Sequence, residues 1–238
     1  MADVRTPPRV AVLLSGCGYL DGAEIRESVL TLLALDQQGA AYQCIAPNAP
    51  QFHVVNHLTG EPVPGAERNM LEESSRISRM GKCLDLAQAR VQDFDALVMP
   101  GGYGVAKNHC NFAFKGVEAE VRPDVAAFVA GFFAAGKPVG AICIAPALVA
   151  LALHGRQDSA VMTLGNDATV AAAMTQLGQQ FTSTPGAREL VIDEANKLVT
   201  TPAYMFDDAA LADVFVGIER CVVEVLRRVS KNIISTGG

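Results

Sequence analysis

Short apolar runs alternate with longer amphipathic segments along this chain. Four of the runs are almost wholly apolar and are bounded by glycine, proline or serine: residues 10–14, 42–46, 96–99 and 139–142. Runs of this length and composition are typical of strands that are buried on both faces of a sheet. We therefore predict four central strands at these positions.

The amphipathic segments between the runs have helical spacing. In residues 24–38, apolar side chains recur at Ile25, Val29, Leu32 and Leu33, which predicts a helix that packs this face on the sheet. Further helices are predicted at 68–79, 84–90, 124–135, 147–153, 169–177 and 209–229, a short edge strand at 52–55, and a hairpin at 189–192 and 197–201.

Alternating strands and helices indicate a parallel sheet with helices on both faces. No linker, repeat or low-complexity tract interrupts the pattern. The prediction is a single α/β domain with a doubly wound, mostly parallel sheet over residues 9–230, flanked by tails at 1–8 and 231–238. In such folds the loops at the carboxyl edge of the sheet build the functional site.

Composition narrows the classes of function. The chain has 238 residues, 50% of them hydrophobic and 18% charged, which excludes a disordered protein. Its net charge of −6 argues against nucleic acid as a partner. The most apolar region, 125–153, is broken by Gly-Lys-Pro at 136–138, and its two parts are shorter than the ~20 residues that a spanning helix needs. Residues 1–8 contain no apolar signal core, so we expect no membrane association and a cytoplasmic location.

The six cysteines are widely spaced, at positions 17, 44, 83, 110, 143 and 221. This spacing contains no CxxC pair and no zinc-binding pattern, so no metal site is predicted. Most of these cysteines are expected to be small buried side chains.

Cys143 is the exception. It follows the strand at 139–142, has Ala141 and Ala145 as small flanking residues, and precedes Pro146, which suits the first turn of a helix. This is the arrangement of a nucleophile elbow. Unpaired N–H groups at the start of the helix are expected to lower the pKa of the thiol. A buried structural cysteine is the alternative.

Two glycine-rich loops follow other strands. The loop at 15–24 has the spacing G-x-G-x-x-x-G, which is one residue too long for a dinucleotide fingerprint, so no cofactor is predicted. The loop ends at Glu24, which is either a catalytic carboxylate or a favourable charge at a helix start. In the loop at 99–108, the N–H groups of Gly101 and Gly102, together with that of Ile144, are candidates for an oxyanion hole. A plain turn is the alternative for this loop.

Three residues near these loops are candidates for the same pocket: Cys17, Asn108 and His109. A Cys–His pair receives little support, because His154 lies about 16 Å along the helix from Cys143 at 1.5 Å per residue. A Cys143–Glu24 site is the preferred hypothesis.

Five motifs occur in order: SGCGYLDGAE (15–24), NHLTGE (56–61), PGGYGVAKN (100–108), CIAPA (143–147) and TTPAYM (200–205). Together they resemble the ThiJ/PfpI superfamily, relatives of class I glutamine amidotransferases, and within it the ElbB branch of sigma cross-reacting or isoprenoid biosynthesis-associated proteins. The resemblance covers essentially the whole chain. It implies a flavodoxin-like fold and a homodimer.

The resemblance also implies an activity, the cofactor-independent conversion of glyoxal or a similar small dicarbonyl to a 2-hydroxy acid, as in glyoxalase III. Cys143 matches the nucleophile and Glu24 the acidic residue that contacts it. Peptidases of this superfamily place histidine directly after the nucleophile, where this chain has Ile144, and amidotransferases carry a late histidine where it has Tyr204. The alternatives are a redox-sensing or stress-response protein with a reactive cysteine and, less favoured, an amidotransferase-like subunit.

Overall fold

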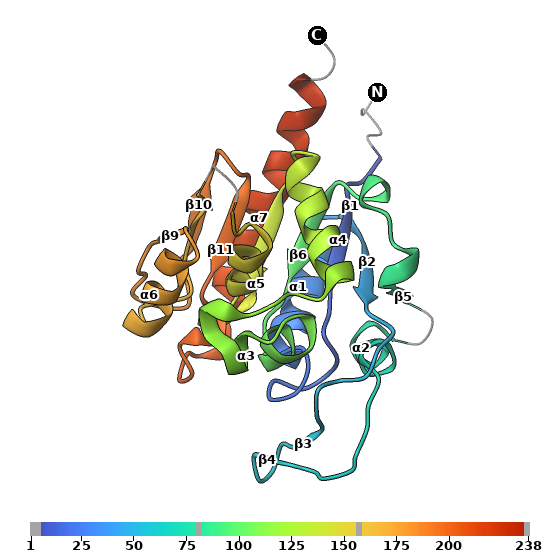
Figure 1. Cartoon of the computed structure of the whole chain (residues 1–238). Coiled ribbons are helices and arrows are strands. Elements are labelled where there is room, and N and C mark those ends of the chain that lie inside the picture. Colours follow the sequence, from blue (N-terminus) through green and yellow to red (C-terminus); the bar gives the residue numbers. More distant parts are fainter. Residues whose placement is uncertain (1–5, 80–81, 156–158, 236–238) are drawn as a thin grey trace.

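The fold is an α/β sandwich around one seven-stranded sheet (Figure 1). The computed structural model describes residues 6–79, 82–155 and 159–235, the last six of these by their backbone alone. The strands are β1 Arg9–Leu13, β2 Ala41–Ala46, β3 Val55–Asn56, β4 Glu61–Pro62, β5 Cys83–Asp85, β6 Ala96–Met99, β7 Val139–Ile142, β8 Val161–Met162, β9 Gln180–Phe181, β10 Val191–Asp193 and β11 Leu198–Thr201. The α-helices are α1 Ile25–Gln37, α2 Met70–Ser78, α3 Phe112–Lys115, α4 Pro123–Ala134, α5 Ala145–Ala152, α6 Ala168–Gln176 and α7 Leu211–Ser235.

The strand order of the main sheet is β10-β11-β7-β6-β1-β2-β5. All pairs are parallel except β10 with β11, which form the predicted hairpin. The predicted class, a flavodoxin-like and mostly parallel sheet in a single domain, is confirmed. Because β1, β6, β7 and β11 are neighbours, the loops that follow these strands meet at one edge.

Each face of the sheet has its own apolar layer. Alternate residues of β1, such as Val10 and Val12, pack with α1 and α7, while Ala11 and Leu13 pack with α4 and α5. In Figure 1, α4 and α5 lie in front of the sheet and α7 behind it. None of the helices described is both long and apolar enough to cross a membrane.

Helix α1 presents the opposite face from the one predicted. It buries Glu27, Ser28 and Thr31 along with Ala34 and Leu35. Three of the four residues predicted to pack on the sheet lie outward instead, with exposed fractions of 45% for Ile25, 48% for Val29 and 41% for Leu33. The fourth, Leu32, is partly buried against the core. Burial of the polar residues is possible because they have partners; the Ser28 hydroxyl, for example, donates to the Glu24 carbonyl oxygen at 2.6 Å.

Three local predictions were wrong. Residues 84–90, predicted as a helix, contain the end of edge strand β5 and then a 3₁₀ turn at Leu86–Gln88, which the Asp85 carboxylate caps. Residues 52–55 do not form an edge strand of the main sheet; β3 begins at Val55 and pairs with β4 in a separate hairpin. Helix α7 continues to Ser235, six residues past the helix end predicted at residue 229.

Candidate active site

Cys143 lies in the sharp turn between β7 and α5. Its φ angle is +61°, a left-handed conformation that is rare for a residue with a side chain and costs of the order of 1–3 kcal/mol. The Cys143 N–H donates to the Thr201 carbonyl oxygen at 2.9 Å, which fixes the turn against the end of β11. The predicted nucleophile elbow is therefore present in the backbone, with the Cys143 side chain only 8% exposed.

The glycine loop after β6 packs directly against this turn. A Cβ atom on Gly101 would lie 2.5 Å from the Cβ of Cys143 and 2.8 Å from Oε2 of Glu27. At Gly102, where φ is +95°, a Cβ would lie 2.3 Å from the Glu24 backbone nitrogen. Both positions require glycine, Gly101 because the side chains of Cys143 and Glu27 lie against it and Gly102 because the backbone before α1 does.

Hydrogen bonds join that loop to the loop after β1. The Glu24 N–H donates to the Gly101 carbonyl oxygen at 3.0 Å, and the Tyr103 N–H donates to that of Tyr19 at 2.7 Å. The motifs at 15–24, 100–108, 143–147 and 200–205 thus meet at the carboxyl edge of the sheet, as the topology predicts.

Glu27 is the carboxyl group that contacts the Cys143 thiol. Its side chain is fully buried and hydrogen-bonds the thiol. Two backbone amides also donate to it, Gly101 to Oε2 at 2.9 Å and Tyr204 to Oε1 at 3.2 Å. Glu27 is therefore held by loops that follow two different strands.

Glu24 was expected to make this contact. The Glu24 carboxylate instead caps α1 by accepting from the Glu27 N–H at 2.6 Å, although Glu24 also lines the cavity beside Cys143. Glu24 and Glu27 lie on either side of the first helical turn, so their carboxyl groups point in different directions. That of Glu24 caps the helix, and that of Glu27 points inward to the thiol. The missed signal is the polar set at positions 27, 28 and 31, which has helical spacing of its own.

Burial is the main cause of the pKa shifts of Glu27 and Cys143. It raises the pKa of Glu27 to about 8, with the charge of Glu24 adding to the effect and the amides of Tyr204 and Gly101 opposing it. Burial, followed by the charge of Glu27, also raises the pKa of Cys143 well above its usual range. The prediction of a lowered thiol pKa was wrong, because the backbone hydrogen bonds from Gly102 and Ile144 favour the thiolate less than desolvation disfavours it.

The three N–H groups predicted to form an oxyanion hole have two different roles. The Gly101 N–H is used by Glu27, whereas the backbone groups of Gly102 and Ile144 face the Cys143 sulfur. Two backbone N–H groups therefore lie beside the sulfur.

A cavity of about 360 Å³ opens above the sulfur. Its described lining consists of Tyr19, Glu24, Gly102, Tyr103, Cys143, Ile144, Asp167, Tyr204, Met205 and Asp207. We call this the inner cavity. A more open, outer cavity of about 640 Å³ shares the tyrosines, Glu24 and Asp207 with it and adds Arg26 and His57. Arg26 donates to the Tyr204 hydroxyl at 3.1 Å, which holds this phenol at the junction of the two spaces.

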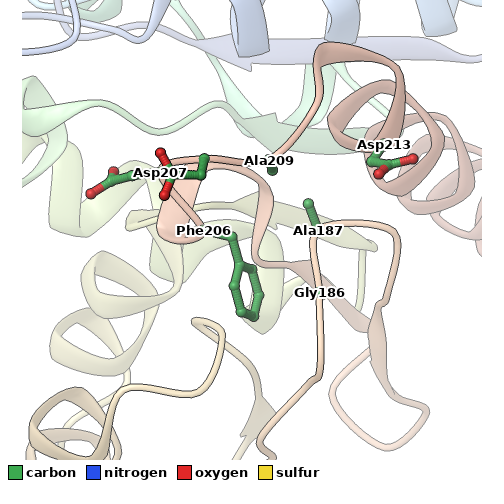
Figure 2. Close-up of a pocket in the computed structure, with 7 residues that line it drawn as sticks. Gly186, Ala187, Phe206, Asp207, Ala209 and Asp213 are labelled. Carbon is green, nitrogen blue, oxygen red and sulfur yellow. The ribbon is translucent and has the colours of Figure 1, made fainter.

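A further cavity of about 420 Å³ adjoins the site at Asp207. In Figure 2, the segment that carries Phe206, Asp207 and Ala209 forms one side of this cavity, and Ala187 and Asp213 lie on the other. Asp207 thus lines both this cavity and the space above Cys143.

The remaining pocket candidates lie elsewhere among the described residues. The Asn108 amide donates to the carbonyl oxygens of Ser15 and Asp21, at 2.9 and 2.8 Å, and so ties two loops together. His109 is buried with Nε2 3.1 Å from the Leu14 carbonyl oxygen, and burial lowers its pKa to about 4. A π-helical turn, Val105–His109, directs both side chains inward.

Cys17 faces the charged residues of α2, not the Cys143 cavity. Burial, and then the charge of Glu73, raise the pKa of its half-buried thiol. The three candidates therefore support the loops around the site. No cluster of metal-ligating side chains occurs among the residues that the structure describes.

Comparisons with known proteins identify the family of this chain. The sequence model of the DJ-1/PfpI family matches residues 19–210. A human mitochondrial protein, glutamine amidotransferase-like class 1 domain-containing protein 3, is 40% identical over 95% of this chain and 85% of its own. The mitochondrial ES1 protein homolog of rat is 39% identical over 95% and 86%.

Solved structures show the same relationship. The isoprenoid biosynthesis protein with an amidotransferase-like domain from Ehrlichia chaffeensis superposes with a TM-score of 0.85 at 38% identity, covering 93% of this chain and 99% of its own. Glyoxalase III from Candida albicans shares the fold alone, with a TM-score of 0.55 and 12% identity over 92% and 97% of the two chains.

The names of the relatives contradict one expectation. The human, rat and zebrafish proteins are all named as mitochondrial, so the cytoplasmic location inferred from the sequence was wrong. That inference rested on a missing apolar signal core, and mitochondrial leader segments are amphipathic rather than apolar.

Proposed function

The chain belongs to the DJ-1/PfpI family, and we propose that it is a glutathione-independent glyoxalase that converts a small 2-oxoaldehyde to a 2-hydroxy acid. The observation that carries the proposal is the Cys143–Glu27 pair, a nucleophile and an acid/base group in hydrogen-bond contact at the base of a cavity.

The first step is attack by Cys143 on the aldehyde carbon. In the molecules in which Glu27 is ionised, a fraction that grows as the pH approaches its pKa of about 8, the carboxylate takes the thiol proton. The carbon–sulfur bond forms, and the carbonyl electron pair moves to oxygen, where the N–H groups of Gly102 and Ile144 donate to it. Glu27 then returns the proton to this oxygen, which completes the hemithioacetal and leaves Glu27 as a carboxylate. Because Glu27 can hold the proton that sulfur loses, the thiol does not need a low pKa of its own.

The next steps oxidise the first carbon and reduce the second. Glu27, or Glu24 across the cavity, removes the C–H proton of the hemithioacetal, an enediol forms, and the proton returns to the neighbouring carbon. This leaves a thioester of Cys143. Water then cleaves the carbon–sulfur bond and releases the hydroxy acid, so that the net change is the addition of one water molecule.

The alternatives receive less support. A redox sensor depends on an exposed thiolate, but Cys143 is buried and its pKa is raised. A glutaminase needs a histidine beside the cysteine, and the described lining of the inner cavity contains none.

We also propose that the protein acts as a homodimer. The exposed apolar stripe Ile25, Val29 and Leu33 occupies one face of α1 at i, i+4 and i+8, while the polar side chains of Glu27, Ser28 and Thr31 face inward. Because this helix exposes apolar residues and buries polar ones, its exposed apolar row is suited to pack against the same row on a second copy of the chain. Ile25 also lines the outer cavity, so this contact would border the site.

The test is turnover of glyoxal and methylglyoxal by purified protein without glutathione. Cys143→Ala should abolish turnover, and Cys83→Ser, at an edge strand, should leave it unchanged. Product formed in D₂O should contain deuterium on the reduced carbon, because the enediol exchanges its proton. Full activity of Cys143→Ala would refute the mechanism.

Two further variants separate the carboxylates. Glu27→Gln should lower kcat by at least about 100-fold, the usual contribution of a positioned acid/base group. Glu24→Gln should have a smaller effect if it serves mainly as a helix cap. The reverse order would restore the catalytic role to Glu24.

A further inference from the structure

The charges around the Cys143 cavity are of one sign. Three carboxyl groups line it, those of Glu24, Asp167 and Asp207, and its described lining contains no lysine, arginine or histidine. The adjoining cavity in Figure 2 shares Asp207 and adds Asp208 and Asp213. The path from the sulfur through Asp207 to the second cavity is therefore acidic along its length.

These carboxyl groups do not contribute equally. Asp207 is exposed and makes no ion pair or hydrogen bond within the described part of the chain, so its charge is available to a ligand. Asp167 caps α6 by accepting from the Thr169 and Val170 amides at 2.7 and 2.9 Å, which holds its carboxylate in place at the rim. Asp213 is paired with Arg188 at 3.2 Å and contributes less.

Two positive groups line the outer cavity, together with Glu24 and Asp207. Arg26 and His57 line only the outer cavity, and Arg26 is bound to the Tyr204 hydroxyl. Lys107 lies 4.8 Å from the centre of the Tyr103 ring and donates to the Leu20 carbonyl oxygen. None of these cations lines the cavity above Cys143 or the cavity beyond Asp207.

The size of the site points in the same direction. A water molecule, with one heavy atom, occupies roughly 30 Å³ in the liquid. By this measure glyoxal, with four heavy atoms, occupies about 120 Å³. The inner cavity alone holds about 360 Å³, and the cavity beyond Asp207 adds about 420 Å³. A substrate with a side chain of several further atoms fits this space.

We propose that the preferred substrate is a carbonyl compound with a positively charged group, an aldehyde or 2-oxoaldehyde carrying an ammonium or guanidinium, and that Asp167 and Asp207 determine this specificity. This inference rests on the proposed function for the reaction at the carbonyl. The carbonyl binds at Cys143 and the N–H groups of Gly102 and Ile144, and the cation lies between Asp167 and Asp207. Carbonyl compounds with a carboxylate or phosphate are disfavoured by the same charges.

Charge-matched thiol reagents test this without requiring turnover. Aminoethyl and sulfonatoethyl methanethiosulfonate have similar size and opposite charge, and peptide mass spectrometry measures their rates at Cys143. Normalised to their rates with a free thiol, the cationic reagent should be at least about tenfold faster at low salt, and this ratio should fall with added salt. Asp167→Asn and Asp207→Asn should each reduce the ratio severalfold, whereas Asp36→Asn, on the exposed side of α1, should not.

Turnover supplies the second measurement. Methylglyoxal, an ammonium-bearing 2-oxoaldehyde and an anionic one are compared as substrates of wild type and of Asp207→Asn. The cationic substrate should have the highest kcat/KM, and the variant should raise its KM with little change in kcat. A reagent ratio near one, or one that both aspartate variants leave unchanged, overturns the inference even if methylglyoxal is converted. A high ratio without turnover of any carbonyl supports the cation preference and rejects the proposed reaction.

Discussion

Glu27→Gln should change how the stability of the protein depends on pH. The Glu27 carboxyl group has a pKa of about 8 in the folded protein against an ordinary value of 4.5. Between these values the unfolded chain loses this proton while the folded protein keeps it. Unfolding is therefore favoured progressively as the pH rises from 4.5 to 8, and the stability that the protonated group provides is lost above 8.

The magnitude follows from the two pKa values. At 1.36 kcal/mol per pKa unit, the difference between 4.5 and 8 corresponds to about 5 kcal/mol of unfolding free energy. Glutamine cannot ionise and removes this dependence. It also exchanges one acceptor oxygen for an NH₂ group facing the amide of Gly101 or Tyr204, a cost of about 1–3 kcal/mol that is the same at every pH.

Urea unfolding of wild type and variant at pH 5, 6, 7, 8 and 9 measures the effect. Wild type should be the more stable protein at pH 5, and the difference should shrink or reverse by pH 9, changing by up to about 5 kcal/mol across the series. Glu72→Gln, on the exposed side of α2, is the matched control and should remain parallel to wild type. If Glu27→Gln also remained parallel to wild type, Glu27 would have an ordinary pKa and the account of the buried pair would be wrong.

Three other variants test the remaining parts of the structure. Gly101→Ala should destabilise the protein by about 1–3 kcal/mol and reduce the alkylation rate of Cys143, because the added Cβ would lie 2.5 Å from the Cβ of that residue. Gly186→Ala is the control: its Cβ meets no atom within 4 Å, so stability and alkylation rate should both be unchanged. His109→Gln should remove a loss of about 3 kcal/mol of stability that wild type shows in urea unfolding as the pH falls from 6.5 to 4, because the pKa of this buried histidine is about 4 instead of 6.5 and the unfolded chain takes up the proton first. Val29→Glu should shift the proposed dimer to monomer in sedimentation velocity without unfolding it, since this side chain is 48% exposed in the single chain; an unchanged sedimentation coefficient would place the dimer contact elsewhere or exclude it.

The central strands could be predicted because the signal for them is local. The bounds of Ala96–Met99 and Val139–Ile142 are those expected from the sequence, since a strand buried on both faces must be apolar at every position. Cys143 was identifiable for a related reason. The turn that carries it is so crowded that its neighbours must be small, and Ala141 and Ala145 record that requirement in the sequence.

Glu27 could not be found in the same way, because its burial depends on groups distant in sequence. Apolar spacing in α1 selected the face of Val29, whereas the sheet edge buries the polar face, where the amides of Gly101 and Tyr204 and the thiol of Cys143 provide partners. The raised pKa of the thiol was missed for the same reason. A helix start is visible in the sequence, but the desolvation that outweighs it exists only after the loops have assembled.

The absence of side-chain space beside Gly101 has a consequence for how this protein can evolve or be engineered. At Gly101 the side chains of Cys143 and Glu27 leave no room for a side chain, and at Gly102 the backbone of residues 22–24 leaves none. A substitution at either position cannot reshape the site without moving the reacting groups or the loop before α1. The opposite wall is made of side chains, Tyr103, Tyr204, Asp167 and Asp207, of which Asp207 is free of any bond in the described part of the chain. Relatives that keep the chemistry and change the substrate should therefore differ along this second wall, and a library confined to it would sample new specificities while leaving the reacting groups in place.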